Sequence, residues 1–329
     1  MRRVLKAVSP FAFLLAAVVG AQAQTVLTTI NYPTGVNGVA VDYIADRAYV
    51  LLPNYSNGAN AVQVLDTKDN AVLTTFPSAG VANAIAVNPI TGVVYVAGAV
   101  PSTTNPSGIE SVIVAFNPNT GAVVATIPIT ATAGYGIVAL AVDPLNDRIY
   151  ASDASDNALV VINGRSHRVR ESVPLNGQTP AGLAVNFLTG KVYVALNDNE
   201  VAIVEPEDDR VTFATYGSQT SGVAVDPFLG REYVTDGVFT SPTVGVLNRR
   251  GATVASVPVG LFPQGLDVDF VTSTVFVANE ADGTITKIDG HSNTVVTTIP
   301  VAANSLAVNP RDRTVYAAGS ASVTVLTED

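Results

Sequence analysis

The chain repeats a short pattern of small, apolar and polar positions seven times. Each copy has a small residue, an aliphatic residue, Ala or Asp, Val, and then Asp or Asn, as in "GVAVD" at 38–42 and "GLDVD" at 265–269. The copies end at Asp42, Asn88, Asp143, Asn186, Asp226, Asp269 and Asn309, spaced 40 to 55 residues apart. Self-similarity with such a period predicts a repeat architecture.

Each copy is followed by three more runs rich in β-branched and aromatic residues, separated by Gly, Pro, Asn and Asp. The second run carries an aromatic residue, at Tyr49, Tyr95, Tyr150, Tyr193, Tyr233, Phe276 and Tyr316. The third resembles "AVQVLD", and the fourth resembles "AVLTTFP". These runs predict four short strands per repeat and no helices. The Asp or Asn that ends each first run is expected to bond the backbone of a tight turn.

A repeat of four strands and about 44 residues is typical of a β-propeller blade. We therefore predict an all-β, seven-bladed propeller of four-stranded antiparallel blades. The last repeat lacks its fourth run, whereas "TVLTTINYP" at 25–33 matches that type. We expect this N-terminal strand to complete the last blade, which closes the ring and leaves no exposed sheet edge.

The second runs also carry a family resemblance. "YVTD" at 233–236 and "FVAN" at 276–279 are similar to Tyr-Val-Thr-Asn, and "YVAG" at 95–98 and "YVAL" at 193–196 are close variants. The chain thus resembles the YVTN-type β-propeller repeat family over 24–329. The resemblance implies seven blades and an exported or cell-surface prokaryotic protein. It implies no single activity, because such propellers serve varied binding roles.

The first 23 residues have the pattern of a signal peptide. "MRRVLK" is basic, "FAFLLAAVVG" is apolar and "AQA" at 21–23 is a cleavage site of small residues. We expect cleavage after Ala23 by the general secretory route, because the Ser or Thr that precedes a twin-arginine pair is missing. The mature chain is then a single propeller domain, 24–329, in the periplasm or outside the cell. No second apolar stretch is long enough to span a membrane.

Composition excludes several function classes. The net charge of −10, without a basic patch, excludes nucleic acid as a partner. The chain has no Cys, no Trp and only two His residues, His167 and His291, both in predicted turns far apart. This excludes Ser-His-Asp and Cys-His catalysis and ordinary zinc or copper sites. An enzyme built on this chain would have to use carboxylates, with or without a metal ion.

Uneven loops between second and third strands indicate which face carries function. We predict a polar funnel at the channel mouth of this loop-rich face. Its candidate residues are Asn37, Asn83, Ser221, Gln264 and Asn304 before the first strands, Asp153, Asp236 and Asn279 at the ends of second strands, and Glu280. Such a funnel would hold a small hydrophilic ligand or a hard cation such as calcium, which takes oxygen ligands. The alternative is that these polar groups are merely solvated.

Three charges interrupt otherwise apolar columns of the aligned repeats. Asp267 stands where the other six repeats have Ala, Lys287 lies in the third strand of repeat 6, and Glu232 lies in the second strand of repeat 5. Because buried charges are normally paired, we predict one ionic cluster near the interface of blades 5 and 6. Two alternatives stay open: solvated strand ends, especially for Glu232, or an Asp267 that faces the axial channel and marks a site.

The functional prediction is a non-enzymatic, extracytoplasmic binding module, expected to be a monomer without a cofactor. Its loop-rich face would bind a partner protein, a cell-envelope component or a small polar ligand. The alternative is a calcium-assisted hydrolase or lactonase that acts through Asp153, Asp236 and Glu280 with Asp267. A third class, a repeat unit of a surface layer, is less favoured because the sequence shows no anchor and no second domain.

Overall fold

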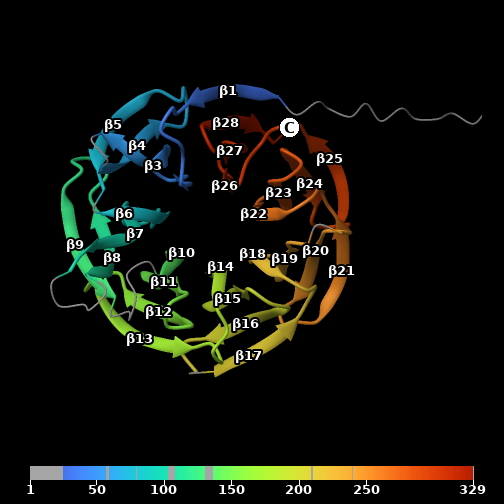
Figure 1. Ribbon diagram of the computed structural model, residues 1–329. Helices are drawn as coiled ribbons and strands as arrows, with labels where there is room; N and C mark the ends of the chain where they lie inside the picture. The colour runs from blue at the N-terminus through green and yellow to red at the C-terminus, as the bar shows by residue number, and fades with distance from the viewer. Residues whose placement is uncertain are drawn as a thin grey trace, which may run out of the picture.

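The protein is a seven-bladed β-propeller, as the sequence predicts (Figure 1). The computed structural model describes residues 25–56, 59–78, 80–102, 108–129, 136–208, 210–238 and 240–328. The predicted signal peptide lies outside the described residues. All the elements within them are strands, and they form seven four-stranded antiparallel sheets arranged in a ring. In the described part of the chain no helix is long and apolar enough to cross a membrane.

In blades 1 to 6 the strands follow one another outward from the axis in chain order, and in blade 7 the outermost strand is β1. The innermost strands are β2 (Gly38–Asp42), β6 (Val81–Val87), β10 (Ile137–Asp143), β14 (Pro180–Asn186), β18 (Thr220–Asp226), β22 (Pro263–Asp269) and β26 (Ser305–Asn309). The second strands are β3 (Arg47–Ser56), β7 (Val94–Pro101), β11 (Arg148–Asp153), β15 (Lys191–Leu196), β19 (Arg231–Asp236), β23 (Thr274–Asn279) and β27 (Thr314–Ala318). Blade 1 begins with β2 and blade 7 begins with β26.

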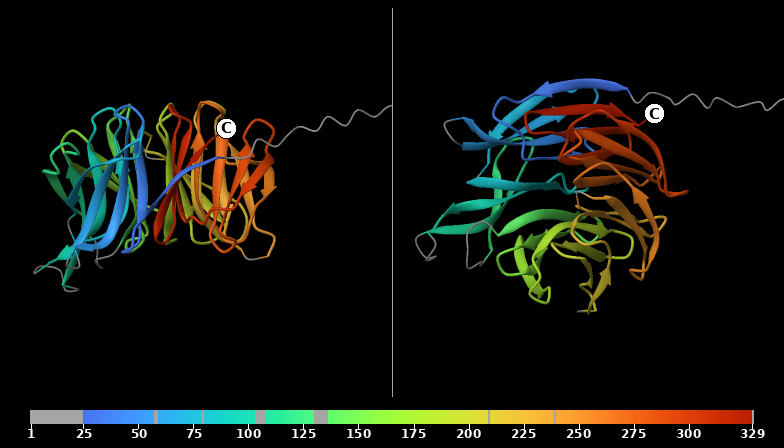
Figure 2. Two further views of the ribbon diagram at one scale, coloured as in Figure 1. Left: turned by 90° about the horizontal axis from the view of Figure 1, so that it is seen from above. Right: turned by 45° about the vertical axis from the view of Figure 1, so that its right-hand side comes forward.

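The third strands are β4 (Ala59–Asp66), β8 (Ile109–Phe116), β12 (Ala158–Asn163), β16 (Glu200–Glu205), β20 (Thr243–Asn248), β24 (Thr284–Asp289) and β28 (Ser322–Thr327). The outer strands are β5 (Val72–Pro77), β9 (Val123–Ile129), β13 (Arg168–Pro174), β17 (Arg210–Thr215), β21 (Thr253–Pro258), β25 (Thr294–Ile299) and β1 (Val26–Asn31). The β7–β8 hairpin projects beyond the neighbouring blades on the loop-rich face (Figure 2).

The ring closes through the N-terminal strand, which confirms the sequence prediction. Strand β1 pairs with β28 of the last blade, and Ile30 lies opposite Val323. The Tyr32 N–H extends the contact by donating to the Ala321 carbonyl (2.8 Å). Since β1 covers the outer edge of β28, the seventh blade has four strands like the others.

The apolar core is divided among the seven interfaces between neighbouring blades, each of which holds one cluster of buried side chains. The aromatic residue of each second strand is fully buried and packs against the following blade: Tyr49, Tyr95, Tyr150, Tyr193, Tyr233, Phe276 and Tyr316. Large buried rings supply much of the hydrophobic stabilisation of such interfaces. The repeated aromatic residue therefore fills the interface between its own blade and the next one.

The Asp or Asn that ends each first strand forms a tight turn in every blade, as predicted. Asp42 is representative: its Oδ1 atom accepts hydrogen bonds from the N–H groups of Ile44 (3.0 Å) and Ala45 (2.9 Å). The same pair of bonds recurs at Asn88, Asp143, Asn186, Asp226, Asp269 and Asn309. All seven side chains are buried. These residues are structural, and they fix the shape of the tight-turn face.

Candidate functional site

The axis of the ring contains two cavities, one at each face. The cavity at the loop-rich face has a volume of about 340 Å³, and Val138, Ser221, Gln264 and Asn304 line its mouth. The cavity at the tight-turn face has a volume of about 350 Å³. Both cavities are lined by Leu183, Val223, Leu266 and Leu306, so the two adjoin along the axis.

Five of the predicted funnel residues lie at the starts of inner strands. Ser221, Gln264 and Asn304 come together around the loop-rich cavity. Asn37 and Asn83 occupy the equivalent repeat positions of blades 1 and 2. Asn37 is exposed, and its side-chain amide donates a hydrogen bond to the Ala82 carbonyl (2.8 Å). Asn83 is half-buried. The polar side chains that line this cavity therefore come from blades 5 to 7.

The other predicted funnel residues do not face the mouth. Asp153 is buried, and its Oδ1 atom accepts hydrogen bonds from the Ser155 and Asp156 N–H groups (3.0 and 3.2 Å). Asp236 Oδ1 likewise accepts the N–H groups of Ser218 and Gln219 (3.2 and 3.1 Å). Both carboxylates are buried and order loop backbone, so they are not the open polar groups that the predicted funnel at the mouth requires.

Asn279 and Glu280, the remaining predicted residues, also lie apart. Asn279 is buried and its amide donates to Thr284 (3.1 Å) and Thr286 (2.8 Å) in the neighbouring strand β24. Glu280 is exposed at the start of the following turn. Among the residues that the structure describes, no three His, Cys, Asp or Glu side chains gather as a metal site would require. The carboxylates of the hydrolase alternative are thus not assembled in one place.

The three pattern-breaking charges do not form the predicted cluster. Glu232 precedes Tyr233 in β19, and successive strand residues point to opposite sides. Tyr233 packs against blade 6, so Glu232 points back toward blade 4. Asp267, Phe276 and Lys287 lie opposite one another in register, which puts them on the side of blade 6 that faces blade 7. The predicted cluster fails because strand alternation separates its members.

Glu232 lies in the interface between blades 4 and 5, with 1% of its surface exposed. The Tyr193 hydroxyl approaches the carboxyl without completing hydrogen-bond geometry, and among the described residues neither carboxyl oxygen has a hydrogen-bond partner. Burial raises the pKa of Glu232 to about 7. Near neutral pH this carboxyl is therefore half protonated inside an apolar interface, where a charge is costly.

Lys287 contacts blade 7 and is not paired with Asp267 in the described structure. Its ammonium group lies 5.9 Å from the centre of the Phe276 ring and donates a hydrogen bond to the Glu328 carbonyl. The Glu328 side chain accepts a hydrogen bond from the Thr272 hydroxyl. Burial and the neighbouring Glu328 carboxyl raise the pKa of Asp269 to about 7. These polar contacts hold the end of β28, in blade 7, against blade 6.

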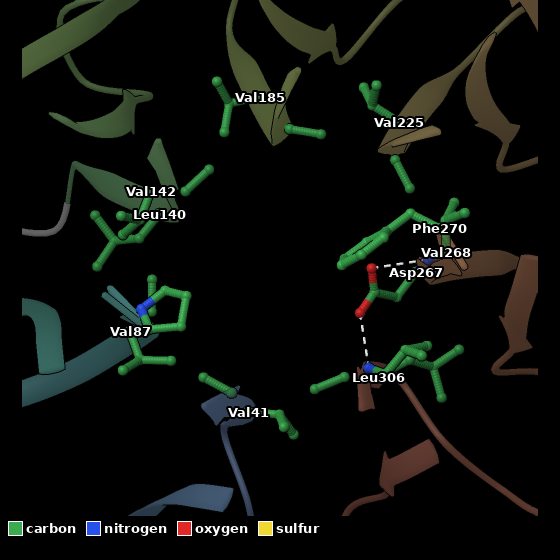
Figure 3. A pocket seen from close by; sticks show the side chains of 18 of the residues that line it. Val41, Val87, Leu140, Val142, Val185, Val225, Asp267, Val268, Phe270 and Leu306 are labelled. Atoms are coloured by element: carbon green, nitrogen blue, oxygen red, sulfur yellow. Dashed lines mark hydrogen bonds between the residues drawn. The ribbon is translucent and has the colours of Figure 1, made fainter. Parts of the chain in front are cut away.

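Asp267 faces the tight-turn cavity, which decides between the alternatives that the sequence left open. Its carboxylate projects from β22 toward the open centre of the cavity, beside apolar side chains of the surrounding strands (Figure 3). Its Oδ1 atom accepts the Val268 N–H and its Oδ2 atom accepts the Val308 N–H, both at 2.8 Å. No salt bridge to Asp267 occurs within the described ranges.

The chemistry of the cavity follows from this isolation. Burial raises the pKa of Asp267 to about 6, and the two N–H donors limit the rise because they stabilise the charged form. The carboxyl is therefore mostly ionised at neutral pH. Leu306 lies beside Asp267, and Val and Leu side chains such as Val142 and Val185 line the other sides of the cavity (Figure 3). An ionised group without a counter-ion in such surroundings favours binding of a positive charge.

The mouth of this cavity is aromatic and apolar, a feature that the sequence reasoning missed. Tyr43, Phe187 and Phe270 line the cavity, and the Phe270 ring lies 5.9 Å from Tyr43, 5.7 Å from Phe187 and 6.0 Å from Phe228. Around them each of six turns exposes one large apolar residue: Ile44, Ile90, Leu145, Leu188, Phe228 and Val271. The sequence signal was an apolar residue two places after the turn Asp or Asn in six of the seven repeats, as in "DYI" and "DPF".

Neither the protein-family models nor the curated proteins compared with this chain give a match. The likeness to the YVTN-type family thus stays a resemblance carried by the second-strand repeats. The function has to be argued from the geometry of the channel.

Proposed function

We propose that this propeller is an extracytoplasmic binding module that holds a small molecule in the tight-turn cavity of its axis. The observation that carries the proposal is Asp267, an unpaired carboxylate in a cavity of about 350 Å³ with apolar side chains around it. Cavities of this size and composition, with a few polar groups that fix orientation, are typical of small-molecule sites. The extracytoplasmic location rests on the signal-peptide pattern of residues 1–23.

The proposal moves the site away from the loop-rich face. The sequence favoured that face because its loops vary, but its carboxylates Asp153 and Asp236 bond their own loops. The tight-turn cavity contains the Asp267 carboxylate and adjoins an exposed apolar rim. Such a rim guides a partly apolar ligand toward the axis.

A thermal-shift screen with a cavity-filling variant tests the proposal. Val142 lines the cavity from β10 and is half-buried, so Val142→Phe would occupy the space without adding charge. A panel of small organic cations, anions and neutral molecules should contain compounds that raise the melting temperature of the wild type, because a ligand of the folded state stabilises it. The shift should disappear in Val142→Phe. Shifts that persist in this variant, or a panel without any shift, would contradict the proposal.

A further inference from the structure

We infer that the ligand of the tight-turn cavity is an organic cation with an alkylated nitrogen, held between the Asp267 carboxylate and the aromatic rings of the mouth. This inference rests on the proposed function and deepens it, since it names the ligand class.

The first argument is charge. Asp267 is the only side chain that carries a charge at neutral pH among the described residues that line the cavity. The phenol of Tyr43, which also lines it, is neutral at this pH. Its two oxygens each accept one backbone N–H, which stabilises the anion but adds no positive charge. A cationic ligand would supply the missing charge in a partly enclosed site, where the attraction is stronger than in water. An anionic ligand would meet repulsion.

The second argument is the aromatic mouth. Tyr43, Phe187 and Phe270 line the same cavity as Asp267, and Figure 3 shows the Phe270 ring pointing inward on the same side as the carboxylate. Aromatic rings attract cations over their faces, and rings grouped around a site bind quaternary ammonium groups. Alkyl groups on the nitrogen also suit the Val and Leu walls.

The third argument is the shape of the cavity. Leu183, Val223, Leu266 and Leu306 line both this cavity and the loop-rich cavity, so the two cavities adjoin along the axis. The volume of about 350 Å³ lies at the small end of ligand sites. A compact cation fits these limits better than a long polyamine or a folded peptide.

The basic residue nearest this mouth does not oppose the inference. Arg311 borders the aromatic rim together with Tyr43 and Phe270. Its guanidinium is bonded to the Asp46 carboxylate at 2.8 Å, and Asp46 also pairs with Lys68 at 2.8 Å. Because Arg311 is exposed and paired, its charge is largely screened at the mouth. The carboxylate of Asp267 stays the dominant charge inside the cavity.

Calorimetric titration with matched probes tests the inference. Choline carries an alkylated cation, 3,3-dimethylbutan-1-ol has the same shape without the charge, and ethanolamine has the charge without the methyl groups. Wild-type protein should bind choline roughly tenfold or more tightly than the neutral alcohol, because the charge pair is lost. Ethanolamine should also bind more weakly than choline, because it makes poorer contacts with the rings.

Two variants separate this inference from the proposed function. Asp267→Asn keeps the shape and removes the charge, so choline affinity should fall roughly tenfold or more while the alcohol is unaffected. Val142→Phe, or Val185→Phe if the first variant fails to fold by circular dichroism, should abolish binding of all three probes.

The outcomes are distinct. If choline and the alcohol bind equally, if Asp267→Asn binds choline normally, or if ethanolamine binds more tightly than choline, the ligand class is wrong. The proposed site still stands if the filled variants block binding. The ligand class is also wrong if choline fails to bind while another molecule does so in a Val142-dependent way. If probes bind the filled variants unchanged, the proposed function fails as well.

Discussion

The Oδ2 atom of Asp267 in blade 6 accepts a hydrogen bond of 2.8 Å from the backbone N–H of Val308 in blade 7. The other six blades carry Ala at the position of Asp267, and an Ala side chain has no acceptor for the next inner strand. The bond therefore links two inner strands across the wall of the channel. It also holds the carboxylate in the cavity, which makes Asp267 a structural bridge and a binding group at once.

Asp267→Asn should change the pH dependence of stability. The pKa of Asp267 is about 6 in the folded protein and 3.8 in the unfolded chain, so the folded state holds the proton more tightly. The wild type thus loses stability as the pH rises from about 4 to about 6, whereas the neutral Asn variant does not. The variant should gain roughly 2–3 kcal/mol relative to the wild type over this range. Urea unfolding at pH 4.5 and pH 8 measures the difference, and a constant difference would contradict the burial of this carboxyl.

Glu232→Leu should stabilise the interface between blades 4 and 5. The carboxyl is buried without a partner, and its pKa is about 7 in the folded protein against 4.5 in the unfolded chain. The cost of its charge therefore grows as the pH rises from about 4.5 through 7, and Leu removes it. The expected gain at pH 8 is roughly 1–3 kcal/mol and is smaller at pH 5. Glu232→Gln is the control for shape. Destabilisation by Leu at pH 8 would show that the carboxyl has a partner.

Removal of residues 25–31 should open the ring. These residues include β1, whose pairing with β28 completes blade 7. The variant should melt roughly 10 °C or more below the wild type and should associate through the uncovered edge of β28. A protein that lacks only residues 1–23 is the matched control. Equal melting temperatures and an unchanged elution volume in size-exclusion chromatography would count against closure by β1.

Gly222→Ala should disturb the packing of inner strands beside the channel. A Cβ atom at Gly222 would lie 2.2 Å from the Gln264 carbonyl oxygen in the next blade, so β18 and β22 would have to separate. We expect a loss of roughly 1–3 kcal/mol. Gly237→Ala is the matched control, because its Cβ would come no nearer than 3.4 Å to another atom. Chemical denaturation of both variants distinguishes the two cases, and equal stabilities would argue against the close approach.

The sequence predicts the fold well because the same four-strand pattern occurs in all seven repeats. The buried Tyr column, the turn residues typified by Asp42 and the completion of blade 7 by residues 26–31 all occur as expected. Each of these features depends on local chemistry: a run of β-forming residues, an Asx turn or an unpaired strand edge. The sequence pattern alone is therefore enough to predict them. The YVTN-type resemblance itself stays a prediction.

The site was less accessible to sequence reasoning. Asp267 was identified as a departure from an Ala column, but its direction depends on which side of β22 faces blade 7. Strand alternation between Glu232 and Tyr233 could have shown that Glu232 faces away from blade 6. The aromatic mouth was missed because Tyr43, Phe187 and Phe270 come from separate repeats and meet only when the ring closes.

The most direct test of the account is a crystal structure of the protein with choline. The account predicts an ammonium group in the tight-turn cavity, within roughly 5 Å of the Asp267 carboxylate and over the face of Phe270. Asp267 should keep its bond to the Val308 N–H. Choline at the loop-rich mouth beside Gln264 and Asn304, or an Asp267 side chain turned away from the channel, would contradict the central claim.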